Sequence, residues 1–425
     1  MYIKRVTLDN VRCFDNLNVE FASAGSSALF LGDNGDGKST ILRSLAMGLC
    51  DESSAAALFR ELTGAFVRRH PDLDATRSKE TGTIKIDLDD EGTVYRISTI
   101  IRSLPNFERV QQNIVLINGE KTTVNQDKFP WDHIFVVGYG PGLRTRGTTD
   151  YQRYLAVDAV YPLFRYDTPL QNPELSIRRL IDTARKRGET PEESDHNEHR
   201  ILKEIQSLMT VLLDLKSEEH FRLTSTGLVV DGFWGSAGLN QLGDGFQATI
   251  TWVLDLISWW FLRENGKSTW DLKTLNGIVI IDEVEQHLHP RWQHRILPLL
   301  RERFPKIQFI VATHSPLVAS GSGDVEVHLF EKGQQSVVKP YGWLAENVYG
   351  MMGLEDSRST QFRQTLNRYE ELDYKKIKGR ATEHELAEWK ELNIVVASLP
   401  EGDTVGLSLE MANIVKTLKE TEPEP

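Results

Sequence analysis

Cysteine is scarce in this chain of 425 residues, which contains only Cys13 and Cys50. Two cysteines exclude a disulfide scaffold and a zinc ribbon, because both need more thiols. Basic residues are also in the minority, with 49 Lys and Arg against 61 Asp and Glu and a formal net charge of −12. Because nucleic acid binds to a basic face, this balance excludes a chain coated with nucleic acid and leaves room only for a local basic stripe.

Long hydrophobic runs are also missing. The most apolar stretch, Ala248 to Leu262, is too short to span a bilayer comfortably and contains Asp255 near its middle, so we interpret it as a buried helix. The N-terminal stretch alternates apolar and polar residues and is not followed by a signal-peptide core. The remaining composition, 40% apolar and 26% charged, is typical of a globular protein. We therefore expect a reduced, cytoplasmic protein without a membrane anchor.

The order of the expected elements indicates an α/β fold. Two strands, a glycine-rich turn and a helix over residues 39–49 are predicted first, and a β-rich block follows between residues 83 and 137. Residues 165–222 change character and predict a short helical insertion. Within it, residues 191–195 are interpreted as a solvated loop, and the apolar spacing predicts a helix over 199–215.

From Gly277 the strand and helix patterns alternate again. Helical spacing resumes after Gly342, and residues 420–425 are expected to form a disordered tail. The chain is therefore divided into an N-terminal half of the α/β unit, the helical insertion, a C-terminal half and a helical C-terminal region, over residues 1–165, 166–224, 225–335 and 336–425.

The segment Gly32 to Ser39 fits the phosphate-binding pattern G-x-x-x-x-G-K-[ST]. It lies between an expected strand at 28–31 and an expected helix, where backbone N–H groups and a helix N-terminus can surround phosphate. Lys38 would reach the β- and γ-phosphates, and Ser39 would ligate Mg²⁺. A chance match is expected only about 0.01–0.02 times in a chain of this length, from average residue usage. The predicted nucleotide-binding residues are Asn34, Gly35, Asp36, Gly37, Lys38, Ser39 and Thr40.

Two further apolar runs end in polar residues. Ile278 to Ile281 precedes Asp282 and Glu283, as expected for a buried parallel strand whose C-terminal end faces a ligand. We predict that Asp282 holds Mg²⁺ through water and that Glu283 accepts the proton of the attacking water. Many strands end in an acid, so this interpretation depends on the phosphate-binding loop. The run Phe309 to Ala312 leads to His314, which is either a packing residue or a contact to the γ-phosphate.

These three motifs, in this order, resemble the ABC-type ATPase heads of the SMC, RecF and OLD-like ATPases over roughly residues 1–335. The segment Leu8 to Phe14 matches the opening strand of those heads, in which Arg12 would lie near the nucleotide. Asp282 to Gln293 is similar to ATP-binding proteins of bacterial antiphage systems, including the ATPase subunits of Septu- and PARIS-type defence. The resemblance implies ATP and Mg²⁺ as cofactors. It also implies a P-loop NTPase of the ABC/RecF-like head type, with an antiparallel β lobe, a helical insertion and a C-terminal helical extension.

Heads of this class need a signature motif from a second head, and Leu242 to Gln247 resembles that motif. Without the other motifs, a simple helix-capping loop would be preferred. The chain departs from the family pattern at three places. Gly243 stands where the family usually has Ser, and residues 134–141 occupy the Q-loop position without a Gln. His289 replaces the usual Asp of a loop that contacts the opposite subunit. The residues expected at the partner's γ-phosphate are Gly243, Asp244 and Gly245.

Several other patterns are given plainer interpretations. The histidines at 287, 289 and 294 do not share one helix face, so a dimer contact is preferred to a metal site. Beyond His314 the chain contains no Asp-x-Asp pair of the kind that OLD-family nucleases carry, so any nuclease is expected to be a separate protein. Four basic clusters are interpreted singly as solvated helix faces and together leave room for a nucleic-acid groove, at residues 68–70, 178–179, 185–187 and 375–380.

The sequence therefore predicts an ATP-binding and hydrolysing ABC-type ATPase that forms a homodimer or higher oligomer around ATP. Its helical parts would transmit the nucleotide state to a partner effector, a nuclease, and the resemblance implies antiphage defence. One alternative is a RecF/SMC-like DNA-repair ATPase that acts directly on DNA. The nucleic-acid partner that the basic clusters leave room for is DNA or RNA. A second alternative is a scaffold that holds ATP and hardly turns over.

Overall fold

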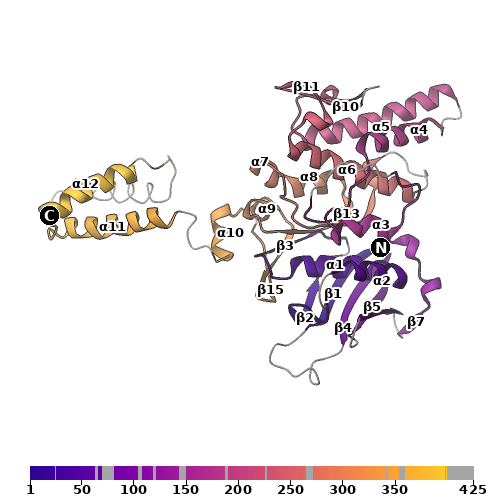
Figure 1. Cartoon of the computed structure of the whole chain (residues 1–425), viewed down its shortest axis with the longest axis horizontal. Helices are drawn as coiled ribbons and strands as arrows, with labels where there is room; N and C mark the ends of the chain where they lie inside the picture. Colours follow the sequence, from indigo (N-terminus) through magenta and orange to yellow (C-terminus); the bar gives the residue numbers. More distant parts are fainter. Residues whose placement is uncertain are drawn as a thin grey trace, which may run out of the picture. The chain divides into compact units, whose positions relative to one another are not determined.

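The computed structural model divides the chain into two compact units, Met1–Met352 and Gly353–Pro425 (Figure 1). The structure describes residues 1–23, 25–62, 66–68, 81–103, 108–117, 121–142, 150–186, 190–224, 227–264, 271–340, 342–353, 359–397 and 399. The expected tail at 420–425 and the basic residues Arg69, His70 and Arg187 lie outside these ranges.

The centre of the first unit is a sheet of six strands, β3 (Ala28–Gly32), β8 (Val136–Tyr139), β12 (Asn276–Ile281), β13 (Lys306–Thr313), β14 (Glu326–Glu331) and β15 (Gln334–Val338). Their order is β15-β14-β3-β13-β12-β8, and every neighbouring pair is parallel except β14 and β15. All of β3 and all but the first residue of β12 are buried, because both faces of the sheet are covered. The predicted parallel strands are therefore present.

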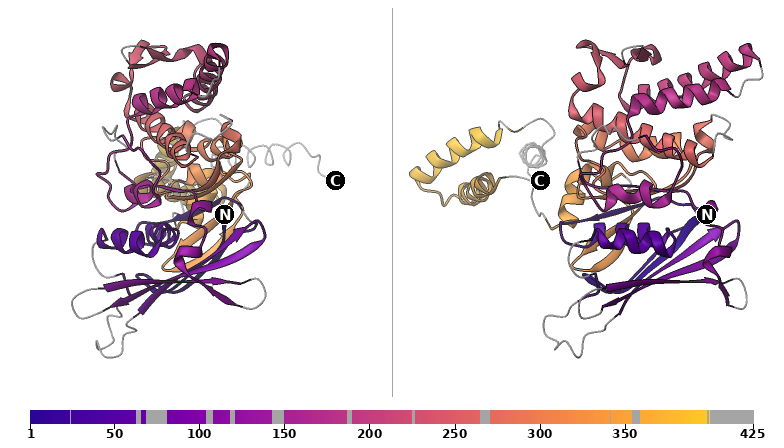
Figure 2. Two further views of the ribbon diagram at one scale, coloured as in Figure 1. Left: turned by 90° about the vertical axis from the view of Figure 1, so that its right-hand side faces the viewer. Right: turned by 45° about the vertical axis from the view of Figure 1, so that its right-hand side comes forward.

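A second, antiparallel sheet consists of β1 (Tyr2–Val11), β2 (Phe14–Glu20), β4 (Thr81–Asp90), β5 (Thr93–Ser103), β6 (Glu108–Leu116) and β7 (Thr122–Val124). Helix α1 (Lys38–Gly48) packs between the two sheets, since its apolar residues share one core with Ile84 of β4 and Ile280 of β12 (Figure 2). Helix α2 (Glu52–Arg60) follows it. The expected turn between β4 and β5 has Glu91 and Gly92 at φ 52° and 91°, as a tight hairpin requires.

The other face of the parallel sheet is covered by α6 (Asp244–Arg263), against which α4 (Pro173–Lys186) packs; α4 in turn contacts α5 (Pro191–Leu212). The expectation of a loop at 191–195 is wrong, because α5 already begins at Pro191. The Thr190 side chain caps this helix by accepting a hydrogen bond from the Glu193 N–H at 3.2 Å. Proline has no N–H to lose at the first helical position, and the acidic residues after it suit a helix N-terminus.

A small three-stranded sheet next to the insertion was not expected from the sequence. It contains β9 (Phe221–Thr224), β10 (Gly227–Gly232) and β11 (Gly235–Gly238). The remaining helices of the first unit are α3 (Ala156–Val160), α7 (Pro290–Gln293), α8 (Ile296–Arg303), α9 (Pro316–Ser320) and α10 (Ala345–Met351).

The second unit is a helical hairpin of α11 (Thr360–Ile377) and α12 (Glu383–Ala397), which pack through Leu366, Tyr369 and Val396. Among the helices in the described ranges, none has the length and hydrophobicity that a membrane crossing requires. The predicted fold class is confirmed: an α/β unit with an antiparallel β lobe and a helical insertion is followed by C-terminal helices.

Candidate functional site

The phosphate-binding loop joins the end of β3 to the start of α1 and fixes the position of its lysine. Gly37, directly before α1, has a φ of 95°, a conformation that favours glycine. The Lys38 ammonium donates to the backbone carbonyls of Gly32 at 2.7 Å and Asp33 at 2.9 Å. Burial lowers the pKa of Lys38, and the nearby Asp282 carboxylate opposes that shift. The cation is therefore held where the sequence predicts phosphate.

Most of the predicted nucleotide-binding residues meet in one cavity of about 330 Å³. The walls come from three distant segments of the chain: the end of β1, the phosphate-binding loop and the residues after β12. The lining residues are Arg12, Cys13, Asn34, Gly35, Gly37, Lys38, Ser39, Thr40, Asp282 and Glu283.

Asp36 was expected to bind the nucleotide but is not among the residues that line this cavity. Its carboxylate instead accepts hydrogen bonds from the Asp33 N–H at 2.7 Å and the Lys332 N–H at 3.0 Å. Lys332 lies in the turn between β14 and β15. Asp36 therefore fixes the shape of the loop and ties it to the neighbouring hairpin.

Two carboxylates lie at the end of β12, facing the phosphate-binding loop. Asp282 is 2% exposed and accepts a hydrogen bond from the Ser39 side chain. Burial raises the pKa of Asp282, while Ser39 and nearby cations lower it. Burial also raises the pKa of Glu283, and the charge of Asp282 adds to the shift. The Ser39 hydroxyl and the Asp282 carboxylate supply the hard oxygen ligands that Mg²⁺ prefers, so these residues fit that ion.

Glu283 has a φ of 51°, in the left-handed region that non-glycine residues rarely adopt. Such strained residues persist only where the surrounding structure fixes them, and they concentrate at functional sites. The sequence motif predicted the identity of this residue but not its backbone conformation.

His314 follows β13 and does not line the cavity. Its charge lowers the pKa of Glu283, so its imidazole lies within electrostatic reach of that carboxylate. The backbone N–H of His314 donates to Glu285 Oε1 at 2.8 Å, and its Nδ1 lies 3.1 Å from the same oxygen. Glu285 is 7% exposed and was missed by the sequence reasoning. Its position in the sequence, two residues after Glu283, was the signal that could have identified it as a residue of the site.

Two arginines lie near the cavity. Arg12, predicted near the nucleotide, lines the cavity with a φ of 46° and its guanidinium 5.2 Å from the Phe66 ring. Burial lowers the pKa of Arg12, and the charge of Arg43 adds to the shift. Arg43 was not predicted. It donates to the Leu163 carbonyl at 2.9 Å and to the Tyr166 hydroxyl, and its charge lowers the pKa of Asp282.

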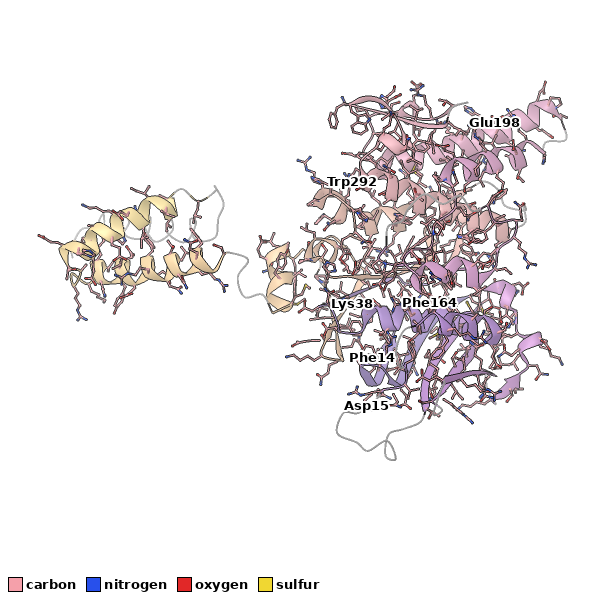
Figure 3. All side chains as sticks on the ribbon, in the orientation of Figure 1. Phe14, Asp15, Lys38, Phe164, Glu198 and Trp292 are labelled. Atoms are coloured by element: carbon pink, nitrogen blue, oxygen red, sulfur yellow. The ribbon has the colours of Figure 1, made fainter. Side chains whose placement is uncertain are left out.

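The signature-like residues lie elsewhere in the first unit. Gly243 is the N-cap of α6, and Gly243, Asp244 and Gly245 line a second cavity of about 1240 Å³. Among the described residues, no residue lines both cavities. Figure 3 shows the same separation, with Lys38 at the start of α1 and Trp292 of the second cavity apart from it. The signature-like residues and the phosphate-binding loop of one chain therefore line different cavities.

Aromatic and basic side chains surround the signature residues. The rings of Phe233, Trp234, Phe246 and Trp292 contact one another in sequence, with centroids 4.8, 5.2 and 4.8 Å apart. His289 lines the same cavity as the N-cap of α7 and accepts a hydrogen bond from the Arg291 N–H at 3.3 Å. In the described part of the chain, no group of three or more His, Cys, Asp or Glu side chains is placed to hold a metal.

Comparisons with known proteins match two parts of the chain to AAA domain families. The family “AAA domain, putative AbiEii toxin, Type IV TA system” matches residues 155–320, and an AAA domain family matches residues 5–134. Septu protein PtuA of Bacillus mycoides (strain KBAB4) is 27% identical over 345 residues, which cover 79% of this chain and 41% of the relative. The retron Ec83 probable ATPase of Escherichia coli is 26% identical over 421 residues, 81% of this chain and 75% of the relative. The chain thus spans less than half of the Septu relative.

Among solved structures, the SMC head domain of Thermotoga maritima is 14% identical with a TM-score of 0.45, and covers 80% of this chain and 98% of that one. The recombination mediator protein RecF has the same identity and coverage with a TM-score of 0.42. The sequence relatives and domain matches confirm the class that the motifs indicated: the chain is similar to the Septu and retron ATPases, and AAA domain families match two parts of it.

Proposed function

We propose that this chain binds and hydrolyses ATP, oligomerises around it, and thereby controls a separate effector protein, a nuclease, in antiphage defence. The observation that carries the proposal is the single cavity where Lys38, Ser39, Asp282 and Glu283 meet. The antiphage setting comes from the resemblance and from the Septu and retron relatives.

The residues of the cavity divide the work of hydrolysis. Lys38 and the backbone N–H groups of its loop bind and orient the phosphates. Ser39 and Asp282 would hold Mg²⁺, which when bound neutralises negative charge on the phosphate oxygens. Glu283 accepts the proton of the attacking water, and its raised pKa makes it a stronger base than a solvated glutamate. His314, held by Glu285, would contact the γ-phosphate.

The separation of the two cavities supports oligomerisation. Asp244 and its neighbours begin the 20-residue helix α6, whose N-terminus favours an anion. Since the phosphate-binding loop of the same chain lines another cavity, the anion that fits this helix is the nucleotide of a second copy. Each complete site would then combine the loop of one chain with the signature of the other.

The alternative of direct action on DNA is not favoured, because several residues of the basic clusters, among those that the structure describes, are engaged within the chain. Arg178 donates to the Thr224 carbonyl, Arg179 donates to the Tyr151 carbonyl, and Arg185 pairs with Glu198. Lys375 lies 2.8 Å from Glu371 and 2.7 Å from Glu385. Cations that are already paired have less to gain from phosphate.

Substitution of Glu283 by Gln tests the ATPase proposal. Glu283→Gln keeps the size of the side chain and removes the base, so hydrolysis should fall about 10²–10⁴-fold while ATP binding persists. Glu302→Gln, at an exposed position of α8, is the matched control and should hydrolyse ATP at the wild-type rate. Single-turnover hydrolysis and retained nucleotide are measured in parallel. If Glu283→Gln hydrolysed ATP at the wild-type rate, this residue would be removed from the mechanism. If ATP stayed bound and unhydrolysed in every variant, the alternative of a scaffold that holds ATP with little turnover would be favoured.

A further inference from the structure

The strand next to β12 ends in a tyrosine that contacts the proposed Mg²⁺ side of the site. Tyr139 is the last residue of β8 and pairs in register with Ile281. Its backbone carbonyl accepts a hydrogen bond from the Asp282 N–H at 2.8 Å. Tyr139 stands at the Q-loop position, where the chain has no glutamine. The backbone of Tyr139 is therefore attached directly to Asp282.

The side chain of the same tyrosine reaches the helix that carries the signature. The Tyr139 hydroxyl donates to Asp255 Oδ2 at 2.9 Å. Its ring packs against Trp252, one turn earlier on α6, with centroids 5.7 Å apart. Both Tyr139 and Asp255 are buried, with 1% and 2% of their surfaces exposed.

The second oxygen of Asp255 holds the start of the helical insertion. The Gln171 N–H donates to Asp255 Oδ1 at 3.0 Å, and the Gln171 side-chain carbonyl accepts from the Ser258 hydroxyl at 3.2 Å. Gln171 lies two residues before α4. One buried carboxylate thus connects β8, α6 and the entrance to the insertion.

A carboxylate in an otherwise apolar helix is costly. Burial raises the pKa of Asp255 to about 6, although its hydrogen bonds oppose the shift. A leucine would fill this position without that desolvation penalty, so stability alone does not explain the acid. The Tyr139 hydroxyl and the Gln171 N–H, which both donate to Asp255, connect α6 to the strand beside the nucleotide cavity and to the start of the insertion.

We propose that Asp255 is a positioning residue that couples the nucleotide cavity to the signature motif. This inference rests on the proposed function. A shift of Asp282 when nucleotide binds is passed to Tyr139 through the backbone hydrogen bond, and from Tyr139 to α6 through Asp255. Because α6 is a rigid rod, the shift reaches Asp244 about 16 Å away, three turns towards its N-terminus. Gln171 passes the same shift to the insertion.

Replacement of Tyr139, the last residue of β8, and of Tyr154, whose hydroxyl bonds to β8, separates coupling from stability. Tyr139→Phe removes the hydroxyl that binds Asp255 and keeps the ring and the backbone bond to Asp282. Tyr154→Phe is the matched control, because the hydroxyl of the half-buried Tyr154 bonds only to the Val136 backbone of β8, at 2.9 and 3.0 Å, in the described structure. ATP affinity, the maximal hydrolysis rate and the unfolding midpoint are measured for both variants and for Asp255→Asn.

Tyr139→Phe should bind ATP like the wild type and lose about tenfold in maximal hydrolysis rate, within the 5–150-fold range of coupling between sites. Asp255→Asn should show the same pattern, and Tyr154→Phe should keep the wild-type rate. Equal rates in the two tyrosine variants would overturn the inference, as would a loss of ATP affinity as large as the loss of rate. A wild-type protein that neither binds nor hydrolyses ATP would instead refute the proposed function, and with it the coupling.

Discussion

Two inactive variants should restore activity to each other if the signature acts on a second copy. Lys38→Ala removes the ammonium of the phosphate-binding loop, and Asp244→Arg places a bulky cation in the first turn of α6, where the helix dipole disfavours it. The two residues line different cavities. In a mixed dimer, one site would contain both defects and the other neither. In a 1:1 mixture, half of the dimers are mixed, and one of the two sites in each mixed dimer is intact. Hydrolysis should therefore recover to about a quarter of the wild-type rate.

The assay is ATP hydrolysis by each variant alone and by the mixture at constant total protein. Lys38→Ala should fail to bind ATP, whereas Asp244→Arg should bind it normally because its own cavity is intact. A mixture of Lys38→Ala with Glu283→Gln is the control. Both of those changes lie on the phosphate side of the site, so no intact site forms and the mixture should stay inactive. Hydrolysis by Asp244→Arg alone, or an inactive first mixture, would refute the assignment of the signature.

Two further predictions concern stability. Gly37→Ala places a Cβ 2.4 Å from Cys13 Sγ and 2.5 Å from the Phe14 ring, so it should weaken ATP binding and destabilise the fold. Gly35→Ala is the control, because Gly35 has a similar φ of 94° but open space around its Cβ position. The free energy of unfolding should be about 1–3 kcal/mol lower for Gly37→Ala than for Gly35→Ala. Equal unfolding midpoints for the two variants would contradict the steric argument. Asp255, with its pKa raised to about 6, should keep in the folded state a proton that the unfolded chain releases. The stability of the wild type relative to Asp255→Asn should therefore fall by about 2 kcal/mol as pH rises from about 4 to 6. Urea unfolding of both proteins at the two ends of that range checks this, and a constant difference would contradict it.

The phosphate-binding loop and the Asp-Glu strand could be predicted because their chemistry depends on residues close in sequence. A loop of fixed length between a strand and a helix fixes the direction of the Lys38 side chain. An apolar run that is buried on both faces predicts a parallel strand, and the C-terminal end of such a strand is where ligands bind. The structure brings these segments together in one cavity, as that logic requires.

Residues that act across long sequence distances were missed. Arg43 contacts Tyr166, 123 positions away, and Tyr139 contacts Asp255, 116 positions away, so neither pair leaves a local pattern. The strand at 136–139 was expected in sequence with the β-rich block. It instead joins the parallel sheet beside β12, because a short apolar run looks the same in either sheet and only its pairing distinguishes them.

The two glycines of the signature differ in what the fold demands of them. Gly243 has a φ of −61° and nothing within 4 Å of a built Cβ, so the serine usual in the family would fit there. Packing therefore does not explain why this chain has glycine there. At Gly245, by contrast, a Cβ would lie 2.3 Å from the carbonyl oxygen of His287. This glycine lets the segment that follows Glu283 approach the signature closely. If the chain hydrolyses ATP as proposed, a movement of that segment would displace the signature-like residues of the same chain, because interiors are packed without slack. The proposed site of hydrolysis would then be linked to the site that the chain is proposed to complete in a second copy.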